Sequence, residues 1–487
     1  MTSKTTQFFK GVSTQTIITL VMGVMEVVVF AIISRLLSKT DFGYYAAISG
    51  IIAIFMSISE AGLGSAIIQK KNASGEFIST AFSWSMIIGL FVTILVFTLA
   101  PTLATLIADD TLTIPLRMMA ITILFHSIIS VGNGILYRKL SFKTVGLISI
   151  ISYFTASVVS IIMAAKGMGL IAVVALPIVN SVVYILLLAF CVKFPKLFIR
   201  RQETKEIISY GGWLTLGVIV NNLTHQLDKL LLPKWMSVAT LGAYNRPAGF
   251  VSTISNKING IFDTVLFPML SDLQQDASRV KNILLKSVSL LNSFSVILAA
   301  IFFFNAHLII SIFFGVQWLD MVPVMQIISL SVVFNVNGRL VDCFFRSLAF
   351  VKIGFFLRVT SAIVTFTSIY IGSKFGVSGV ALSIVIANTI NILTKVVVLA
   401  IKTRVSVVDV FCKMAVSWKV VLPILVIGVP FLMIGSHTWL INIIFALIFA
   451  VVVVVEFAFY PQFIGKEYVA TAYPMVEKIK NKILVRK

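Results

Sequence analysis

Charged residues are scarce in this chain, and acidic residues are the scarcest. Only 12% of its 487 residues are charged, with 39 Lys and Arg against 18 Asp and Glu, whereas a soluble domain carries about twice that share of charge. Hydrophobic residues make up 59% of the chain and its mean hydropathy is +1.05. No soluble core encloses that much apolar surface, so the composition excludes a soluble enzyme and predicts an integral membrane protein.

Cysteines and catalytic motifs are also few. Cys191, Cys343 and Cys412 lie far apart without Cys-x-x-Cys spacing, which argues against a disulfide framework or a metal site. The chain has no Gly-x-x-x-x-Gly-Lys-Ser/Thr phosphate loop and no His-Glu-x-x-His motif, and its loops are too short for a soluble catalytic domain. We therefore expect no cofactor, no bound metal, no ATP-driven step within this chain and no enzymatic activity.

Long apolar runs dominate instead. A helix of about twenty residues crosses a hydrocarbon core of about 30 Å, and about fourteen runs are long enough. They begin near Thr14, Gly43, Ile78, Ile114, Thr144, Gly169, Ile208, Ala243, Leu284, Met321, Ile353, Val377, Val416 and Trp439. A shorter stretch, 307–315, is expected to lie at the membrane interface or to extend the ninth span. The sequence predicts an all-α polytopic membrane protein with about fourteen transmembrane helices.

The net charge of +21 has a topological explanation. Most Lys and Arg fall in alternate loops, including residues 70–71, 138–143, 193–205, 279–286 and the 466–487 tail. The positive-inside rule then places both termini in the cytoplasm and predicts an even number of spans. The first run is longer than a signal-peptide core and is expected to be retained as a span. The basic balance therefore does not indicate a nucleic-acid partner.

The two halves of the chain resemble each other. An offset of 208 places Arg138, Leu140, Phe142, Gly146, Lys166 and Asn180 on Arg346, Leu348, Phe350, Gly354, Lys374 and Asn388, and an offset of 199 places Ser38, Gly43, Tyr45 and Gly50 on Ser237, Gly242, Tyr244 and Gly249. This repeat predicts two six-helix bundles related by a pseudo-two-fold axis along the membrane normal, with two extra helices. The expected domains are residues 1–200, residues 201–404, and residues 405–487, which hold the extra helices and a basic tail.

Charged and amide side chains interrupt several spans. A charge at the bilayer centre costs about 2.5–3.5 kcal/mol, so such residues are expected to face water, a partner or a substrate. Helical spacing groups Arg246 and Lys257 on one face of the eighth span, and His225 and Asp228 on one face of the seventh. The pattern predicts a polar cavity lined by spans one, two, four, seven, eight and ten. Its candidate residues are Glu26, Glu60, Asn221, Asn222, Asp228, Lys229, Arg246, Asn256, Lys257, Asn259, Asp263 and Arg339.

Each charge also has a structural alternative. Lys395 and Arg358 lie toward the cytoplasmic ends of their spans and are expected to extend to the interface, as are Lys419 and Glu456. Arg339 and Asp342 stand three residues apart, so they either pair with each other or serve function. Asp228 and Lys229 are equally open to both interpretations. Glu26 and Lys257 fall near the middle of their spans and are the hardest to explain structurally.

Several short segments follow one another along the chain in an order that resembles a known family. They are Gly43-Tyr44-Tyr45 and Gly242-Ala243-Tyr244, Glu60-Ala-Gly-Leu-Gly64, Asp228-Lys-Leu-Leu231, Phe267-Pro268 and Phe314-Gly-Val-Gln-Trp318. In order and spacing the chain resembles the polysaccharide transporter family, the Wzx-type flippases and exopolysaccharide exporters of the multidrug/oligosaccharidyl-lipid/polysaccharide (MOP) exporter superfamily. The resemblance implies a V-shaped, alternating-access fold and a substrate of undecaprenyl-pyrophosphate-linked oligosaccharide for O-antigen, capsule or colanic-acid-like exopolysaccharide synthesis. It also implies a polysaccharide polymerase and a chain-length regulator as partners.

The residues and the resemblance together suggest roles. Arg246, Lys257, Lys229 and Arg339 are expected to bind the anionic head group, and Asn221, Asn222, Asn256 and Asn259 the sugar hydroxyls. Glu26, Glu60, Asp228 and Asp263 are expected to couple transport to protons or a cation. A lipid II flippase and a multidrug cation antiporter of the same superfamily stay open as alternatives. A major facilitator is disfavoured because its Gly-x-x-x-Asp-Arg loop is missing, and a membrane glycosyltransferase because the loop at Asp109-Asp110 is short.

Overall fold

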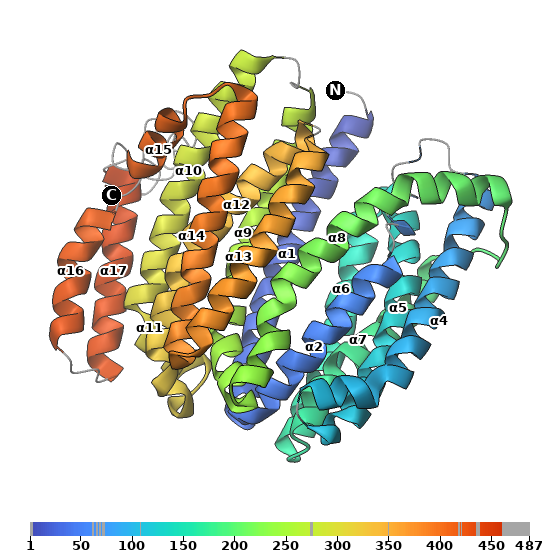
Figure 1. The fold of residues 1–487 in the computed structure, drawn as a ribbon, viewed down its shortest axis with the longest axis horizontal. Coiled ribbons are helices and arrows are strands. Elements are labelled where there is room, and N and C mark those ends of the chain that lie inside the picture. The colour runs from blue at the N-terminus through green and yellow to red at the C-terminus, as the bar shows by residue number, and fades with distance from the viewer. Residues whose placement is uncertain are drawn as a thin grey trace, which may run out of the picture. The chain divides into compact units, whose positions relative to one another are not determined.

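The computed structural model describes residues 3–60, 63–64, 67, 70, 74–107, 109–272, 276–348, 350–416, 419, 421–434 and 439–459, and every regular element in these ranges is a helix (Figure 1). In chain order the first helices are α1 (Ser3–Leu36), α2 (Lys39–Glu60), α4 (Gly75–Leu106), η1 (Asp110–Leu112), α5 (Thr113–Arg138), α6 (Phe142–Ala165), α7 (Leu170–Cys191), α8 (Arg201–Trp235) and α9 (Val238–Asp272). They are followed by α10 (Ala277–Phe304), α11 (Ala306–Phe313), η2 (Val316–Met321), α12 (Val322–Ser347), α13 (Val351–Ser373), α14 (Gly376–Thr403), α15 (Val407–Val416), α16 (Val421–Ile434) and α17 (Trp439–Phe459).

The predicted all-helical, polytopic architecture is confirmed. Within the described residues, ten helices are long and apolar enough to cross a membrane, and two shorter apolar helices lie at Val421–Met433 and Leu440–Val453. The seventh and eighth expected spans correspond to α8 and α9, which have 35 residues each. Neither α8 nor α9 is among the ten apolar spans. About ten to twelve spans are therefore clearly apolar, and α8 and α9 are long helices in which many of the predicted site residues are concentrated.

The chain forms two compact units, one ending at Arg246 and the other beginning at Pro247. In the first unit α2 packs against α4, α5, α7 and α8, and α1 packs against α6. In the second unit α12 packs against α10, α13 and α14, and α16 packs against α17 (Figure 1). The domain boundaries predicted after residues 200 and 404 stay predictions.

Helix boundaries reproduce the 208-residue repeat. Adding 208 to the bounds of α5, α6 and α7 gives 321–346, 350–373 and 378–399, and α12, α13 and α14 occupy 322–347, 351–373 and 376–403. Lys166 and Lys374, which the offset aligns, follow the last residues of α6 and α13 as their C-caps. The helix pairs repeat as well, because α5 packs against α7 as α12 packs against α14. The two segments therefore share one local architecture.

The 199-residue repeat appears at two helix junctions. Leu36 ends α1 and Lys39 begins α2, while Trp235 ends α8 and Val238 begins α9. Each second helix starts on a serine cap, in which a side-chain oxygen accepts a bond from a backbone N–H of the first turn. The Ser38 hydroxyl accepts from the Asp41 N–H at 3.1 Å, and the Ser237 hydroxyl accepts from the Thr240 N–H at 3.2 Å. Equivalent sequences thus produce equivalent turns.

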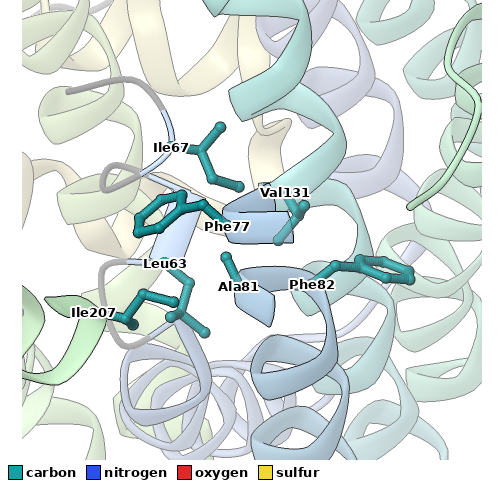
Figure 2. Close-up of a cluster of buried hydrophobic side chains, with 7 residues drawn as sticks. All are labelled: Leu63, Ile67, Phe77, Ala81, Phe82, Val131 and Ile207. Atoms are coloured by element: carbon teal, nitrogen blue, oxygen red, sulfur yellow. The ribbon is translucent and has the colours of Figure 1, made fainter. Parts of the chain in front are cut away.

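Separate hydrophobic clusters hold each unit together. Figure 2 shows one in the first unit, where the start of α8 is joined to α4 and α5 by Leu63, Ile67, Phe77, Ala81, Phe82, Val131 and Ile207. In the second unit the Phe431 and Phe445 rings stack with centroids 3.7 Å apart, in a cluster that also holds Phe304 of α10. The two C-terminal helices are therefore attached to α10 by aromatic packing.

Candidate functional site

The starts of α2 and α9 touch backbone to backbone in the first unit. A Cβ atom added to Gly43 would lie 2.8 Å from the carbonyl carbon of Val238, and one added to Gly242 would lie 2.9 Å from the carbonyl carbon of Lys39. The 199-residue offset relates Gly43 to Gly242 and Lys39 to Val238, so the contact is reciprocal. Only residues without a side chain allow helices to approach this closely. These glycines therefore mark the tightest approach of two repeat-related turns.

Arg246 extends this contact by one helical turn of α9. Its Nε donates to the Ser34 hydroxyl and its Nη2 to the Phe30 carbonyl oxygen, both at 2.9 Å. The guanidinium carbon lies 3.3 Å from the ring centroid of Phe30 and 3.9 Å from that of Phe42, in cation–π geometry worth about 2 kcal/mol when desolvated. Arg246, predicted as an anion donor, here fastens α9 to α1 and α2.

Glu26 belongs to the same neighbourhood. Glu26 of α1, Tyr45 of α2 and Arg246 of α9 all lie near enough to Tyr153 of α6 for a charge on one to affect the others, and Arg246 lies within the same range of both tyrosines. Two predicted residues, Glu26 and Arg246, are thus brought into one cluster. The tyrosines were missed because a single Tyr in an apolar span is indistinguishable from ordinary packing in the sequence.

Asp228 and Lys229 of α8 contact different helices. The Tyr244 hydroxyl of α9 forms a hydrogen bond with the Asp228 carboxylate, which also accepts from the Lys229 N–H at 2.8 Å. The Lys229 stem packs against α2, since a Cβ atom added to Gly50 would lie 3.0 Å from the Lys229 Cβ. Both residues therefore have a structural role in this conformation, and their predicted functional roles stay predictions.

The other predicted residues differ in their exposure. Asn222 and Lys257 are half-buried, and Asn256 and Arg339 are exposed. The side chains of Glu60, Asn221, Asn259 and Asp263 lie outside the described part of the structure. The cavity predicted from the helical faces consequently stays a prediction.

Two charges of the second unit form a pair that the sequence did not indicate, and the expectation for Lys395 was wrong. Asp342 of α12 pairs with Lys395 of α14, with 3.0 Å between Oδ2 and Nζ, rather than with Arg339. Lys395 does not extend to the membrane interface, because its side chain is only 14% exposed. A charge-assisted hydrogen bond in a low-dielectric setting is stronger than an exposed one, so the nearby carboxylate holds the ammonium.

Asp109, in the loop after α4, has a structural function. Its Oδ1 accepts from the Thr111 N–H at 2.9 Å and from the Thr111 hydroxyl at 2.6 Å, and its Oδ2 accepts from the Tyr44 hydroxyl of α2. The bonds from Thr111, followed by the bond from Tyr44, lower the pKa of the Asp109 carboxyl below its usual value. This carboxylate caps η1 and ties the loop to α2.

Comparisons with known proteins point to one family and one fold. A family described as "Polysaccharide biosynthesis protein" matches residues 32–323. The lipopolysaccharide biosynthesis protein WzxC of Escherichia coli is 24% identical over 397 residues, which cover 80% of this chain and 79% of that protein. The lipid II flippase MurJ in its inward closed conformation superposes with a TM-score of 0.69 at 15% identity, over 97% of this chain and 99% of MurJ. An inward-facing multidrug resistance MATE transporter of the MOP superfamily gives 0.65 at 15% identity, over 80% of this chain and 98% of its own.

Proposed function

We propose, from the premise that this chain belongs to the family of polysaccharide biosynthesis proteins, that it flips undecaprenyl-pyrophosphate-linked oligosaccharide repeat units from the cytoplasmic to the periplasmic leaflet. The chain is a multi-pass membrane transport protein with the fold of the MOP superfamily, and it is not an enzyme. The family match over residues 32–323 is the observation that carries this proposal. A place in the inner membrane with both termini in the cytoplasm belongs to the same proposal.

The chemistry of the polar helices supports an anionic substrate. Lys229, Lys257 and Arg339 bring cationic groups into α8, α9 and α12, and a pyrophosphate head group is bound by such donors. Amides such as Asn222 and Asn256 suit sugar hydroxyls. The prenyl tail stays in lipid while the head group crosses along polar helix faces, so no charged group enters bare hydrocarbon. A multidrug antiporter for cations, by contrast, requires a predominantly acidic pocket.

Arg246 has two roles in the proposed cycle. In the conformation described here its donors are used by Ser34 and Phe30. Alternating access requires one side of the transporter to open while the other closes. When the starts of α2 and α9 separate at Gly43 and Gly242, Arg246 loses these partners and its guanidinium becomes available to the anionic head group. Glu26 and Asp228 then bias the two states through protonation or cation binding.

Lipid analysis after depletion tests the proposed substrate. Cells depleted of the protein should accumulate one undecaprenyl-pyrophosphate oligosaccharide that is inaccessible to periplasmic enzymes, and re-expression should restore its export as polymer. Mass spectrometry of the lipid extract identifies the oligosaccharide. Accumulation of lipid II would favour the lipid II flippase alternative, and an unchanged lipid pool with altered drug sensitivity would favour the cation antiporter.

Energy coupling requires its own measurement. Transport into inverted vesicles should accelerate when a pH or sodium gradient is imposed, and Glu26→Gln should remove the dependence on the effective gradient. A rate that is indifferent to both gradients would remove Glu26 from the coupling mechanism while leaving the substrate unchanged. The polymerase and chain-length regulator implied by the resemblance belong to this proposal as partners, and co-purification after cross-linking in cells tests them.

A further inference from the structure

An ion pair joins α12 and α14 inside the second unit. Lys395 Nζ donates to Asp342 Oδ2 at 3.0 Å, and the side chains are 14% and 28% exposed, respectively. A lone charge in a membrane helix is costly, and a partner offsets that cost. Both side chains remain partly exposed at the surface of these two helices.

The first unit provides an internal comparison for this pair. The 208-residue offset relates Asp342 to Gly134 and Lys395 to Leu187, which carry no charge. In that unit a neutral hydrogen bond from the Tyr184 hydroxyl to Asn133 Oδ1, 2.8 Å long, links the corresponding helices α5 and α7. Replacing a buried ion pair with apolar residues is often neutral or stabilising. The helix pair can thus be built without these charges, so their presence points to a ligand.

The charges around this pair favour an anion. Arg339 lies three residues before Asp342, on the same side of α12, and its side chain is exposed. Arg339 and Lys395 together carry two positive charges against the single negative charge of Asp342. An ammonium has three donors and a guanidinium five in a planar fork, so both retain donors for the oxygens of a phosphate group.

We propose that Arg339 and Lys395 form a binding site for a diphosphate group, and that Asp342 holds Lys395 until the ligand displaces it. This inference rests on the proposed function, because the ligand is then the pyrophosphate of the lipid-linked substrate. Exchange of one anion for another keeps Lys395 compensated throughout, and Asp342 is the more exposed of the two partners. A diphosphate competes well because it carries more charge and more acceptor oxygens than one carboxylate.

Titration of the full-length protein in nanodiscs tests this site. Inorganic pyrophosphate and farnesyl pyrophosphate are used as separate probes in calorimetry, and the second should bind tighter if the site serves a lipid. Asp342→Asn removes the competing charge and should tighten binding about tenfold, and Lys395→Met should weaken it about tenfold. Lys402→Met, in the exposed last turn of α14, is the matched control and should bind like the wild type.

If the ion pair is purely structural, Asp342→Asn is not expected to tighten pyrophosphate binding. In that case Asp342→Asn would lower the melting temperature and leave binding unchanged or weaker, and this result in a folded protein would overturn the site. Failure of the Asp342→Asn protein to bind either probe would overturn it as well. The double variant Asp342→Ala/Lys395→Leu should keep wild-type stability and bind both probes more weakly than the wild type does. If Lys395→Met binds the probes as tightly as the wild type does and depleted cells accumulate the expected lipid, this site is refuted while the proposed function stands.

Discussion

The glycine contact between α2 and α9 leads to a quantitative prediction about the conformational equilibrium. In Gly43→Ala the new methyl would lie 2.8 Å from the Val238 carbonyl carbon, well inside ordinary van der Waals contact, so the two helices must move apart. Overpacking of this kind costs about 1–3 kcal/mol. If the starts of α2 and α9 separate during transport, only the conformation described here bears the cost. The open fraction should then rise about fivefold to a hundredfold, at a factor of ten per 1.4 kcal/mol.

Cysteine accessibility measures this shift independently of transport. The reporter is Ser49→Cys, six residues beyond Gly43 on α2 and half-buried, in a chain whose three natural cysteines are replaced. A membrane-impermeant maleimide added on the side of the α1–α2 turn should label it faster in Gly43→Ala and Gly242→Ala. Gly249→Ala controls for the helix propensity of alanine, because a Cβ atom there meets nothing within 4 Å. Equal labelling of wild type and Gly43→Ala at equal protein abundance would refute the closure at this contact.

Three further outcomes are expected. Lys257→Glu should abolish polymer export in a complementation assay when the protein is present at normal abundance, whereas Lys286→Glu, on an exposed surface, should not. Wild-type amounts of polymer from Lys257→Glu would exclude a contact between Lys257 and the anionic substrate. Arg246→Lys keeps the charge but loses the planar fork and its stacking, so its melting temperature should fall by more than that of Arg339→Lys. The lowered pKa of Asp109 stabilises the fold above the carboxyl's unfolded pKa of about 4, and this contribution disappears as the pH falls through the folded pKa. A melting-temperature profile of Asp109→Asn should therefore converge with the wild type in acid and separate from it near neutral pH.

The sequence was a good guide to the helices and their repeat. Apolar length located the ten apolar spans of the described residues, because a helix that crosses a membrane must satisfy its own backbone hydrogen bonds and face lipid with apolar side chains. The offset of 199 predicted that Ser38 and Ser237 are equivalent, and both cap the following helix. These features depend on local sequence, which is why they can be read without coordinates.

Interhelix partners were harder to predict. Helical spacing placed Arg246 on a polar face but gave no means of finding Ser34, Phe30 and Phe42, which are more than two hundred residues away. Lys395 lies toward the end of its span, so the sequence favoured a side chain that extends to the membrane interface. In the structure α14 packs on α12, and Lys395 instead pairs with the Asp342 carboxylate. The rotation of each helix about its axis and the angle at which two helices cross decide which side chains meet. Hydrophobic periodicity predicts neither quantity well when a helix is apolar on most sides.

Positions at which the two repeats differ in chemistry are where the proposed function departs from the shared architecture. Equivalent positions with equivalent chemistry, such as Gly43 and Gly242, are explained by symmetry of the architecture alone. Arg246 instead corresponds to Ala47, and Lys395 to Leu187, so the architecture does not require either charge. Both cations are held by protein partners in this conformation, and a transporter that binds its substrate in only part of its cycle needs such exchangeable partners. Cations that are compensated in both states avoid the cost of a bare charge in the membrane and still leave the substrate able to shift the equilibrium between conformations.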